Sequence, residues 1–298
     1  MIFETGQKFR LAHLSDAHIS PLPRPRWNEL MGKRLTGFMN WHNGRHNIHN
    51  MAVLRALVQD IHAQTPHHVA MTGDILNIGL RSEFAPARDW LASVGAPDAV
   101  SFVPGNHDVY VHSNRADLVR FFAPWMAGGT FPYVRKIGPV AVIGLNSGVP
   151  TLPFVASGRL GKAQLKAFAN LLKSDDLTGM ARVVMIHHPP YASGARFARG
   201  LDDASAFEQI IAEHGAELVL HGHNHRAQVH FLPGPGKHVP VVGVASASAV
   251  PGSPHHLAAY HLYELSKQGA GWHISGRIRG SRADDAGMHD LGGLSLSR

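Results

Sequence analysis

Short apolar runs alternate with helical patterns through the first three quarters of the chain. The helical spacing of apolar residues, at intervals of three and four, predicts amphipathic helices over 48–61, 82–94, 162–174 and 205–215. Between them, apolar runs of strand length occur at 9–15, 68–72, 99–103, 140–146, 182–186 and 217–221. Nearly continuous apolar strands separated by helices indicate an α/β fold whose sheet is covered on both faces.

The pattern changes after residue 238, where strand-like runs follow one another with little helix. The segments "HVPVVGVAS", "AAYHLYEL" and "GWHISGRIRG" predict hairpins of a second sheet. Residues 281–298 contain few apolar anchors, so we expect a flexible C-terminal tail there. With no repeat and no long linker, the sequence favours a single domain over residues 1–280.

Residues 21–46 resemble an insertion between the first strand and the first helix. An apolar helical stripe and a set of basic residues share this segment: Trp27, Leu30, Met31, Leu35, Phe38 and Met39 for the stripe, and Arg24, Arg26, Lys33, Arg34 and Arg45 for the charge. Three interpretations stay open. The stripe packs on the core or on a second subunit, it forms a lid that contacts an anionic membrane, or it belongs to substrate-specificity loops.

Composition narrows the class of protein. The 298 residues are 44% hydrophobic and 16% charged, and they hold neither an 18-residue apolar run nor a cysteine. Disulfides and thiolate metal sites are therefore excluded. The start "MIFETGQKFR" lacks the apolar core of a signal peptide, so we expect a cytoplasmic protein, with peripheral contact at the inner membrane face as a further option.

The net charge of the chain indicates which kinds of partner to expect. The formal net charge of +7 favours anionic partners such as phosphate esters or lipid head groups. Basic residues interleaved with aromatic ones, as in nucleic-acid-binding surfaces, are not visible, so we do not expect a nucleic-acid partner. An oligomer stays possible.

Polar side chains gather where the apolar strands end, and histidine, with 23 copies, is the dominant type. Five separate strand ends carry them: Asp16 and His18; Asp74; Asn106, His107 and Asp108; His187 and His188; His221, His223 and His225. Because the carboxyl ends of parallel strands share one edge of a sheet, these five segments should converge. Carboxylate, imidazole and amide ligands without sulfur suit Mn, Fe or Zn, and the set is large enough for two ions about 3.5–4 Å apart.

The five blocks Asp-x-His (16, 18), Gly-Asp (73, 74), Gly-Asn-His-Asp (105–108), His-His-Pro (187–189) and Gly-His-Asn-His (222–225) occur in this order over about 210 residues. The chain thereby resembles the calcineurin-like metallophosphoesterases, and within them the small bacterial, class III cyclic-nucleotide phosphodiesterase-like branch. The resemblance implies a four-layer αββα sandwich of two mixed β-sheets, the metallo-dependent phosphatase-like fold.

The resemblance also implies roles for the site residues. Asp16, His18 and His225 would bind one metal ion, Asn106, His187 and His223 the other, and Asp74 would bridge them. A hydroxide bridging the two ions would be the nucleophile, with His107 as phosphate contact or general acid, oriented by Asp108. His188 would support the site, and His221 would lie behind it or in the core.

The substrate class is less well determined. The five blocks contain no arginine, and a phosphate monoester usually needs cationic side chains, so a small-molecule phosphodiester such as a cyclic nucleotide or glycerophosphodiester is expected. The alternative is a pyrophosphatase acting on a UDP-linked diacylated sugar, or on another lipid-linked phosphoester, at the membrane surface. A nuclease or a non-enzymatic scaffold is less favoured, because all the expected ligands are present.

Overall fold

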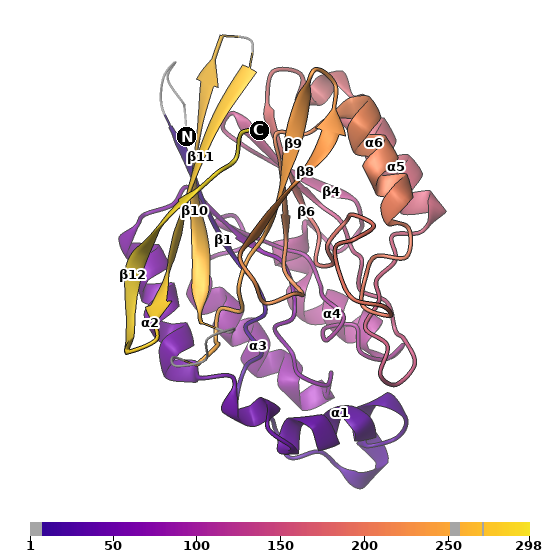
Figure 1. Ribbon diagram of the computed structural model, residues 1–298. Coiled ribbons are helices and arrows are strands. Elements are labelled where there is room, and N and C mark those ends of the chain that lie inside the picture. The colour runs from indigo at the N-terminus through magenta and orange to yellow at the C-terminus, as the bar shows by residue number, and fades with distance from the viewer. Residues whose placement is uncertain (1–7, 251–256, 270) are drawn as a thin grey trace.

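The computed structural model describes residues 8–250, 257–269 and 271–298 and contains two mixed six-stranded sheets (Figure 1). The first sheet runs in the order β12 (Asp285–Leu294), β11 (Gly271–Arg282), β10 (Ala259–Gln268), β1 (Phe9–Leu14), β2 (His68–Met71) and β3 (Val100–Phe102). The second runs β4 (Tyr133–Ile137), β5 (Val140–Gly144), β6 (Ala181–Met185), β7 (Leu218–His221), β9 (Lys237–Gly243) and β8 (Gln228–Gly234).

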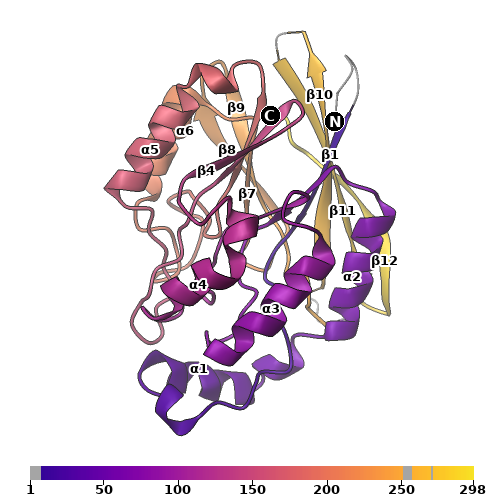
Figure 2. The same cartoon turned by 180° about the vertical axis from the view of Figure 1, so that it is seen from behind.

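Helices cover the outer faces of both sheets, which confirms the expected four-layer αββα sandwich (Figures 1 and 2). The α-helices are α1 (Lys33–His42), α2 (Met51–Ala63), α3 (Arg81–Val94), α4 (Asn114–Phe122), α5 (Lys162–Leu172) and α6 (Ala204–His214). The short 3₁₀ turns are η1 (Trp27–Glu29), η2 (Arg45–Asn47), η3 (Ala123–Met126) and η4 (Asp175–Leu177). The apolar stripes of α2 and α3 pack on the first sheet and those of α5 and α6 on the second.

Each sheet combines a run of parallel strands with antiparallel ones: β1, β2 and β3 are parallel at one edge of the first sheet, and the outer strands β4 and β8 of the second sheet are antiparallel to their neighbours. In the first sheet β1 pairs in parallel with β2 and antiparallel with β10, so that His13 lies opposite Ala70 on one side and His261 on the other. In the second sheet β5, β6, β7 and β9 are parallel. The carboxyl ends of β1–β3 and of β6–β7 consequently meet at one end of the sandwich, the end at which α1 lies (Figure 1).

A tyrosine ties the two sheets together. The Tyr133 hydroxyl on β4 donates a 2.9 Å hydrogen bond to the Phe102 carbonyl on β3, in the other sheet. The ring lies across Gly144, where a Cβ would come within 2.3 Å of it. A glycine is therefore required at this point of β5 for the two sheets to be linked in this way.

Several expectations for the second half of the chain are wrong in detail. The strands after residue 238 do not form a sheet of their own: β9 joins the second sheet, while β10 and β11 extend the first, beside β1. Most of the expected flexible tail is strand β12, which pairs with β11 through a register irregularity. Strands β4 and β8 and helix α4 lie outside the expected elements.

The 21–46 segment holds η1, α1 and part of η2, and most of its apolar stripe faces solvent. Trp27 is 92% exposed, Met31 75%, Met39 54% and Leu35 46%, whereas Leu30 and Phe38 are half-buried. The α1 residues that are buried are Lys33, Gly37 and Trp41. Packing of the whole stripe on the core is therefore excluded, although the helix itself forms. In the described part of the chain, we find no helix with the length and apolarity needed to span a bilayer.

Candidate metal centre

The five polar segments expected at strand ends come together between the two sheets. Three of them follow β1, β2 and β3 of the first sheet, and two follow β6 and β7 of the second. Backbone hydrogen bonds join neighbouring loops: the Asp16 amide donates to the Gly73 carbonyl at 2.9 Å, and the Gly222 amide to the His187 carbonyl at 3.1 Å. The site is thus built on the shared edge of two sheets rather than on one.

Five of the seven expected metal ligands have a left-handed backbone. Nine non-glycine residues have positive φ in the described structure, and five of them are Asp16, His18, Asp74, His223 and His225, with φ between 41° and 68°. Such backbone is disfavoured for residues with a Cβ, and its concentration at one place indicates a functional constraint. The loops turn in this way because each ligand must leave its strand and point back across the sheet edge.

Two of the motif glycines are required by close approach of a carboxylate. A Cβ on Gly105 would lie 2.2 Å from Oδ1 of Asp74, and one on Gly222 would lie 1.9 Å from the Ser15 hydroxyl and 2.5 Å from Oδ2 of Asp16. Any larger residue would displace the acidic side chain beside it. The glycines preceding Asn106 and His223 are therefore part of how the carboxylates are placed.

One ligand cluster is formed by Asp16, His18 and His225. Oδ1 of Asp16 lies 3.1 Å from Nε2 of His225 and 3.9 Å from Nε2 of His18. Nδ1 of His18 donates to the Leu76 carbonyl at 3.0 Å, so the lone pair of this ring is on Nε2, the atom nearer Asp16. The ligand atoms of all three side chains lie within 4.8 Å of one another.

The second cluster is formed by Asn106, His187, His223 and Asp74. Oδ1 of Asn106 lies 3.0 Å from Nδ1 of His223 and 3.3 Å from Nε2 of His187. Nε2 of His187 also lies 3.2 Å from Oδ2 of Asp74, and its Nδ1 donates to the Thr72 carbonyl at 2.6 Å. Asp74 connects the clusters, since Asp16, Asp74 and His187 also form a group within 4.8 Å.

The chemistry of this donor set fits two cations. Two carboxylates, an amide oxygen and imidazole nitrogens whose other nitrogen is already used as a donor all point at one another, and all are buried or half-buried. Oδ1 of Asp16 and Nε2 of His223 are buried with no hydrogen-bond partner in the described residues. Acceptors facing acceptors repel unless positive charge lies between them, which is what metal ions supply.

In the metal-free protein, a proton on His187 supplies positive charge in place of the metal ions. Burial by itself would lower the pKa of His187, but the Asp74 carboxylate raises it to about 9. Burial would raise the pKa of Asp74, but the charges of His187 and His107 hold it well below its usual range. A metal ion has to displace the His187 proton, so its affinity should increase with pH.

The position of Asp108 corrects the role expected for it. Its carboxylate does not orient the His107 ring but accepts four backbone amides, from Gly105 at 2.9 Å, Asp74 at 2.7 Å, Ile75 at 2.9 Å and Leu76 at 3.0 Å. It therefore fixes the loop that carries Asp74. Burial raises the pKa of Asp108, with the charge of Asp74 adding to it, and the donated amides act in the opposite direction.

The carbonyl of Asn77 orients His107 instead. Nδ1 of His107 is within hydrogen-bonding distance of this carbonyl, so the protonated Nδ1 donates and Nε2 faces the cavity. The His107 backbone amide donates to Oδ1 of Asp74 at 2.8 Å. The ring of Tyr110 stacks on that of His107 at 5.5 Å between centroids. Backbone and ring contacts thus hold the side chain beside the bridging carboxylate.

The two remaining histidines of the five blocks, His188 and His221, have other surroundings. Both ring nitrogens of His188 have partners, the Ser147 hydroxyl at 2.8 Å and the Ala156 carbonyl at 3.2 Å, which fits a supporting role although its ring lies close to His187 and His223. His221 is fully buried behind the site, and burial lowers its pKa to about 4.

Four residues of the site lie outside the sequence blocks. A cavity of about 270 Å³ at the metal centre is lined by Asp74, Asn106, His107, His223 and His225, and also by Asn40, Ile48, His49 and Arg199. His49 is buried, with Nδ1 2.7 Å from the Ser248 hydroxyl and its ring 4.6 Å from that of His18. The histidine-dense run "HNGRHNIHN" was the only signal for His49. Asn40 comes from α1, so the 21–46 segment contributes to the site.

Lys33 links α1 to the body of the protein and is not the surface charge that the sequence suggested. Its Nζ contacts the Thr151 hydroxyl, donates to the Val155 carbonyl at 3.0 Å and lies 4.7 Å above the Tyr110 ring. Burial lowers the pKa of Lys33 to about 8. Since Tyr110 stacks on His107, α1 is connected to the site through this lysine.

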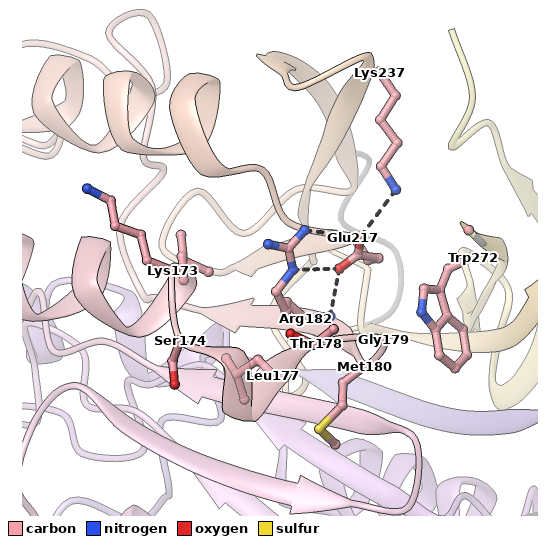
Figure 3. A pocket seen from close by; sticks show the side chains of 12 residues that line it. Lys173, Ser174, Leu177, Thr178, Gly179, Met180, Arg182, Glu217, Lys237 and Trp272 are labelled. Carbon is pink, nitrogen blue, oxygen red and sulfur yellow. Dashed lines mark hydrogen bonds and ion pairs between the residues drawn. The ribbon is translucent and has the colours of Figure 1, made fainter.

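Another cavity, of about 530 Å³, lies away from the metal centre, near the starts of β6, β9 and β11 (Figure 3). Its one carboxylate is paired with two of its cations: Glu217 accepts from Arg182 at 3.0 Å and from Lys237 at 3.3 Å. None of the metal-ligand groups found in the described residues lies here. The chemistry of the molecule is therefore concentrated at the opposite end.

A two-sheet α/β sandwich with oxygen and nitrogen ligands converging at the strand ends defines a metal-dependent phosphoesterase. The chain belongs to the calcineurin-like phosphoesterase family, whose model matches residues 9–227. It is similar to a probable cyclic nucleotide phosphodiesterase of Synechococcus sp., with 28% identity over 218 residues that cover 72% of this chain and 78% of that one.

Solved structures agree on the fold. A dimetal phosphatase from Danio rerio superposes with a TM-score of 0.65 at 14% identity, over 97% of this chain and 98% of the other. The purple acid phosphatase PPD1 of yellow lupin superposes with a TM-score of 0.56 at 12% identity over 96% of this chain, which spans about half (53%) of that protein. At these identities the likeness shows the fold alone.

Proposed function

We propose that the protein hydrolyses a small phosphodiester, such as a cyclic nucleotide or a glycerophosphodiester, at two metal ions. The observation that carries the proposal is the pair of ligand clusters sharing Asp74, with His107 beside them and a cavity in front. When bound, the ions would activate a water as nucleophile and offset charge on the phosphoryl oxygens. Asp16, His18 and His225 would hold one ion and Asn106, His187 and His223 the other.

The chain's own residues have distinct tasks in this scheme. Asp74 would hold both ions at a fixed separation, because its loop is anchored on Asp108. Nε2 of His107 would contact a phosphoryl oxygen or give its proton to the leaving oxygen, while Nδ1 stays bonded to Asn77. The side chain is half-buried, so the proton can be restored from solvent after each turnover.

Support for a diester comes from the relative named as a probable cyclic nucleotide phosphodiesterase. The argument from missing arginines is weaker than the sequence suggested, because Arg199 lines the metal cavity. The test is a panel of mono-aryl phosphate, bis-aryl phosphate, cyclic AMP and glycerophosphodiester, assayed with Mn-, Fe- and Zn-loaded protein. Much faster cleavage of the mono-aryl ester than of every diester would overturn the diester assignment.

A second candidate, a lipid-linked phosphoester cleaved at an anionic membrane surface, is favoured by the exposed apolar residues. Of nine exposed large hydrophobic side chains in the described chain, seven come from three segments near the site: Trp27, Met31, Leu35, Met39, Leu152, Phe154 and Phe197. Met31 and Leu152 line one groove of about 860 Å³, and Arg24 and Arg26 are exposed beside the stripe. Apolar side chains with flanking cations suit an anionic bilayer.

Vesicle binding tests this second candidate. Wild-type protein should co-sediment with phosphatidylglycerol vesicles more than with phosphatidylcholine vesicles, and Trp27→Glu with Met31→Glu should abolish the binding. Val119→Glu, at an exposed apolar residue of α4, is the matched control and should keep it. Equal sedimentation of wild type and the double variant, or none with either vesicle, would exclude the membrane role.

A further inference from the structure

A cavity of about 580 Å³ adjoins the metal centre and has an unusual lining. It shares Arg199, His223 and His225 with the metal cavity, so the two are continuous. Two further arginines, Arg196 and Arg226, line it, and among the described residues no carboxylate does. We propose that this cavity, the arginine pocket, binds a second anionic group of the substrate, a phosphate attached next to the one that reacts.

The arginines of the pocket form no ion pair with the carboxylates that the structure describes. In residues 8–250, 257–269 and 271–298, no carboxylate oxygen lies within 4.0 Å of the side-chain nitrogens of Arg196, Arg199 or Arg226, whereas Arg159, close to the same loop, pairs with Asp202 at 3.0 Å. All three arginines of the pocket are exposed. Guanidinium groups converging on a cavity without a counter-charge are suited to phosphate, whose oxygens they bind in pairs.

The loop that carries Arg196 and Arg199 is fixed to the metal ligands. Asn224, which stands between His223 and His225, donates from Nδ2 to the Gly194 carbonyl at 2.7 Å. On its other side the loop accepts the Ala156 amide at the Ala198 carbonyl, at 2.9 Å. The middle residue of the Gly-His-Asn-His block thus holds the arginine loop in register with the metal centre.

Gln228 stabilises the other wall of the pocket. It donates to the Tyr191 hydroxyl at 2.7 Å, and the Tyr191 ring stacks on that of His230 at 4.1 Å. Tyr191 begins the arginine loop, and Arg226 precedes β8. A substrate whose reacting phosphoryl group lies on the metals would extend into this preformed pocket, where the next group along should be negatively charged.

The substrate class then becomes an ester with two linked phosphates, a pyrophosphate diester or a nucleoside diphosphate derivative. This inference rests on the proposed metal-dependent hydrolysis, because the reacting phosphate has to be placed on the metals. It refines that proposal, since a simple bis-aryl or cyclic diester would leave the arginine pocket empty. It is compatible with a lipid-linked substrate but does not require one.

AMP and ADP form a matched pair of probes, because they share the nucleoside and differ by one phosphate. Dissociation constants are measured by calorimetry on metal-loaded protein with free metal ion in excess, and metal content is checked afterwards so that chelation is excluded. We expect ADP to bind about tenfold more tightly than AMP or better. Arg196→Ala with Arg226→Ala should bring the ratio close to one, while Arg55→Ala on α2, an exposed arginine far from the pocket, should keep it.

The outcomes separate this inference from the proposed function. Equal affinity for AMP and ADP in the wild type, or an unchanged ratio in the double variant with its thermal unfolding preserved, would overturn the arginine pocket even if diesters are hydrolysed. Failure to hydrolyse any phosphoester would overturn the proposed function, while the ratio measured by calorimetry would still report on the pocket. A pyrophosphate diester cleaved faster than a bis-aryl phosphate by wild type, with the preference lost in the double variant, would support both.

Discussion

The Asp108 carboxylate accepts a 2.7 Å hydrogen bond from the backbone amide of Asp74. A buried acid outside both ligand clusters thereby sets the position of Asp74, the carboxylate proposed to bridge the metal ions. The same carboxylate also takes the amide of Gly105, which lies on the loop that carries Asn106. Ligands of both clusters consequently depend on Asp108, through the backbone.

Asp108→Asn should therefore weaken both fold and metal binding. An amide presents two donors to amides that need acceptors, so we expect the free energy of unfolding to fall by about 3 kcal/mol. Urea unfolding of the metal-free protein and elemental analysis after reconstitution measure the two effects. Asp89→Asn, at an exposed carboxylate on α3, is the matched control. A variant that unfolds like wild type would show that the four amides do not depend on this carboxylate.

Asp74→Asn should remove the shared ligand and leave the fold intact. The metal content should fall from two ions per chain to at most one, and phosphodiesterase activity should fall by roughly 10³-fold or more, because a single ion cannot both activate water and hold the phosphoryl group. Elemental analysis and steady-state kinetics at saturating metal provide the readouts. If the variant retained two ions and normal turnover, Asp74 could not be the bridge.

His107→Ala should separate metal binding from turnover. The ring is held by Asn77 and stacked on Tyr110, outside both ligand clusters, so two ions should still bind. The turnover number should fall about 10²–10⁴-fold, and more for an alkyl leaving group than for nitrophenolate, which needs no acid. His238→Ala, at an exposed histidine, serves as the control. Loss of metal in His107→Ala would contradict this assignment.

A buried pair of histidines between the sheets should make the protein sensitive to acid. Burial lowers the pKa of His261 to about 3 and that of its neighbour His13 well below its ordinary value of 6.5. The unfolded chain therefore binds these protons more readily than the folded one, and stability is lost as the pH falls from about 6.5 toward 3. At pH 4.5 His261 should cost roughly 2.5 kcal/mol relative to pH 7, and His13 should add to this loss.

The variant His261→Leu tests whether the buried histidine causes the loss of stability at low pH. The variant removes one titrating group together with Nε2, which has no hydrogen-bond partner in the described residues. Urea unfolding at pH 7.0 and 4.5 should show a smaller loss of stability in the variant than in wild type. The same loss in both proteins would mean that His261 does not titrate differently in the folded and unfolded states.

The sequence was sufficient to predict most elements and the side chains that gather in the two clusters, because both follow from local patterns. Buried parallel strands are apolar throughout, so a polar residue just past the end of one, such as Asp16 or Asp74, stands out. The sequence only partly explained why the polar segments at the strand ends converge. The clusters combine loops of two sheets, and the pairing of β1 with β10 joins segments about 250 residues apart, which no local pattern encodes.

The sequence did not predict three other features, each for a different physical reason. The sequence of β12 is rich in glycine and aspartate, and only scattered apolar side chains such as Met288 and Leu294 pack against the core, so no strand-like alternation is visible. Arg199 lies on a loop without regular secondary structure, so no periodic pattern of residues indicates that its side chain lines the metal cavity. The stripe on α1 was identified, but an amphipathic pattern does not say whether its apolar face is covered, and here four of its six side chains are exposed.

The left-handed backbone at Asp16, His18, Asp74, His223 and His225 has a consequence for how this protein can change. Each such conformation costs about 1 kcal/mol for a residue with a Cβ, and glycine would largely avoid it. Glycine there would relieve the backbone strain, but it would also remove buried acceptors, since Asp74 accepts the His107 amide and Asp16 accepts the His223 amide. The backbone of these loops and the side chains that they carry are therefore specified together, and a change of residue type at any of the five positions alters both.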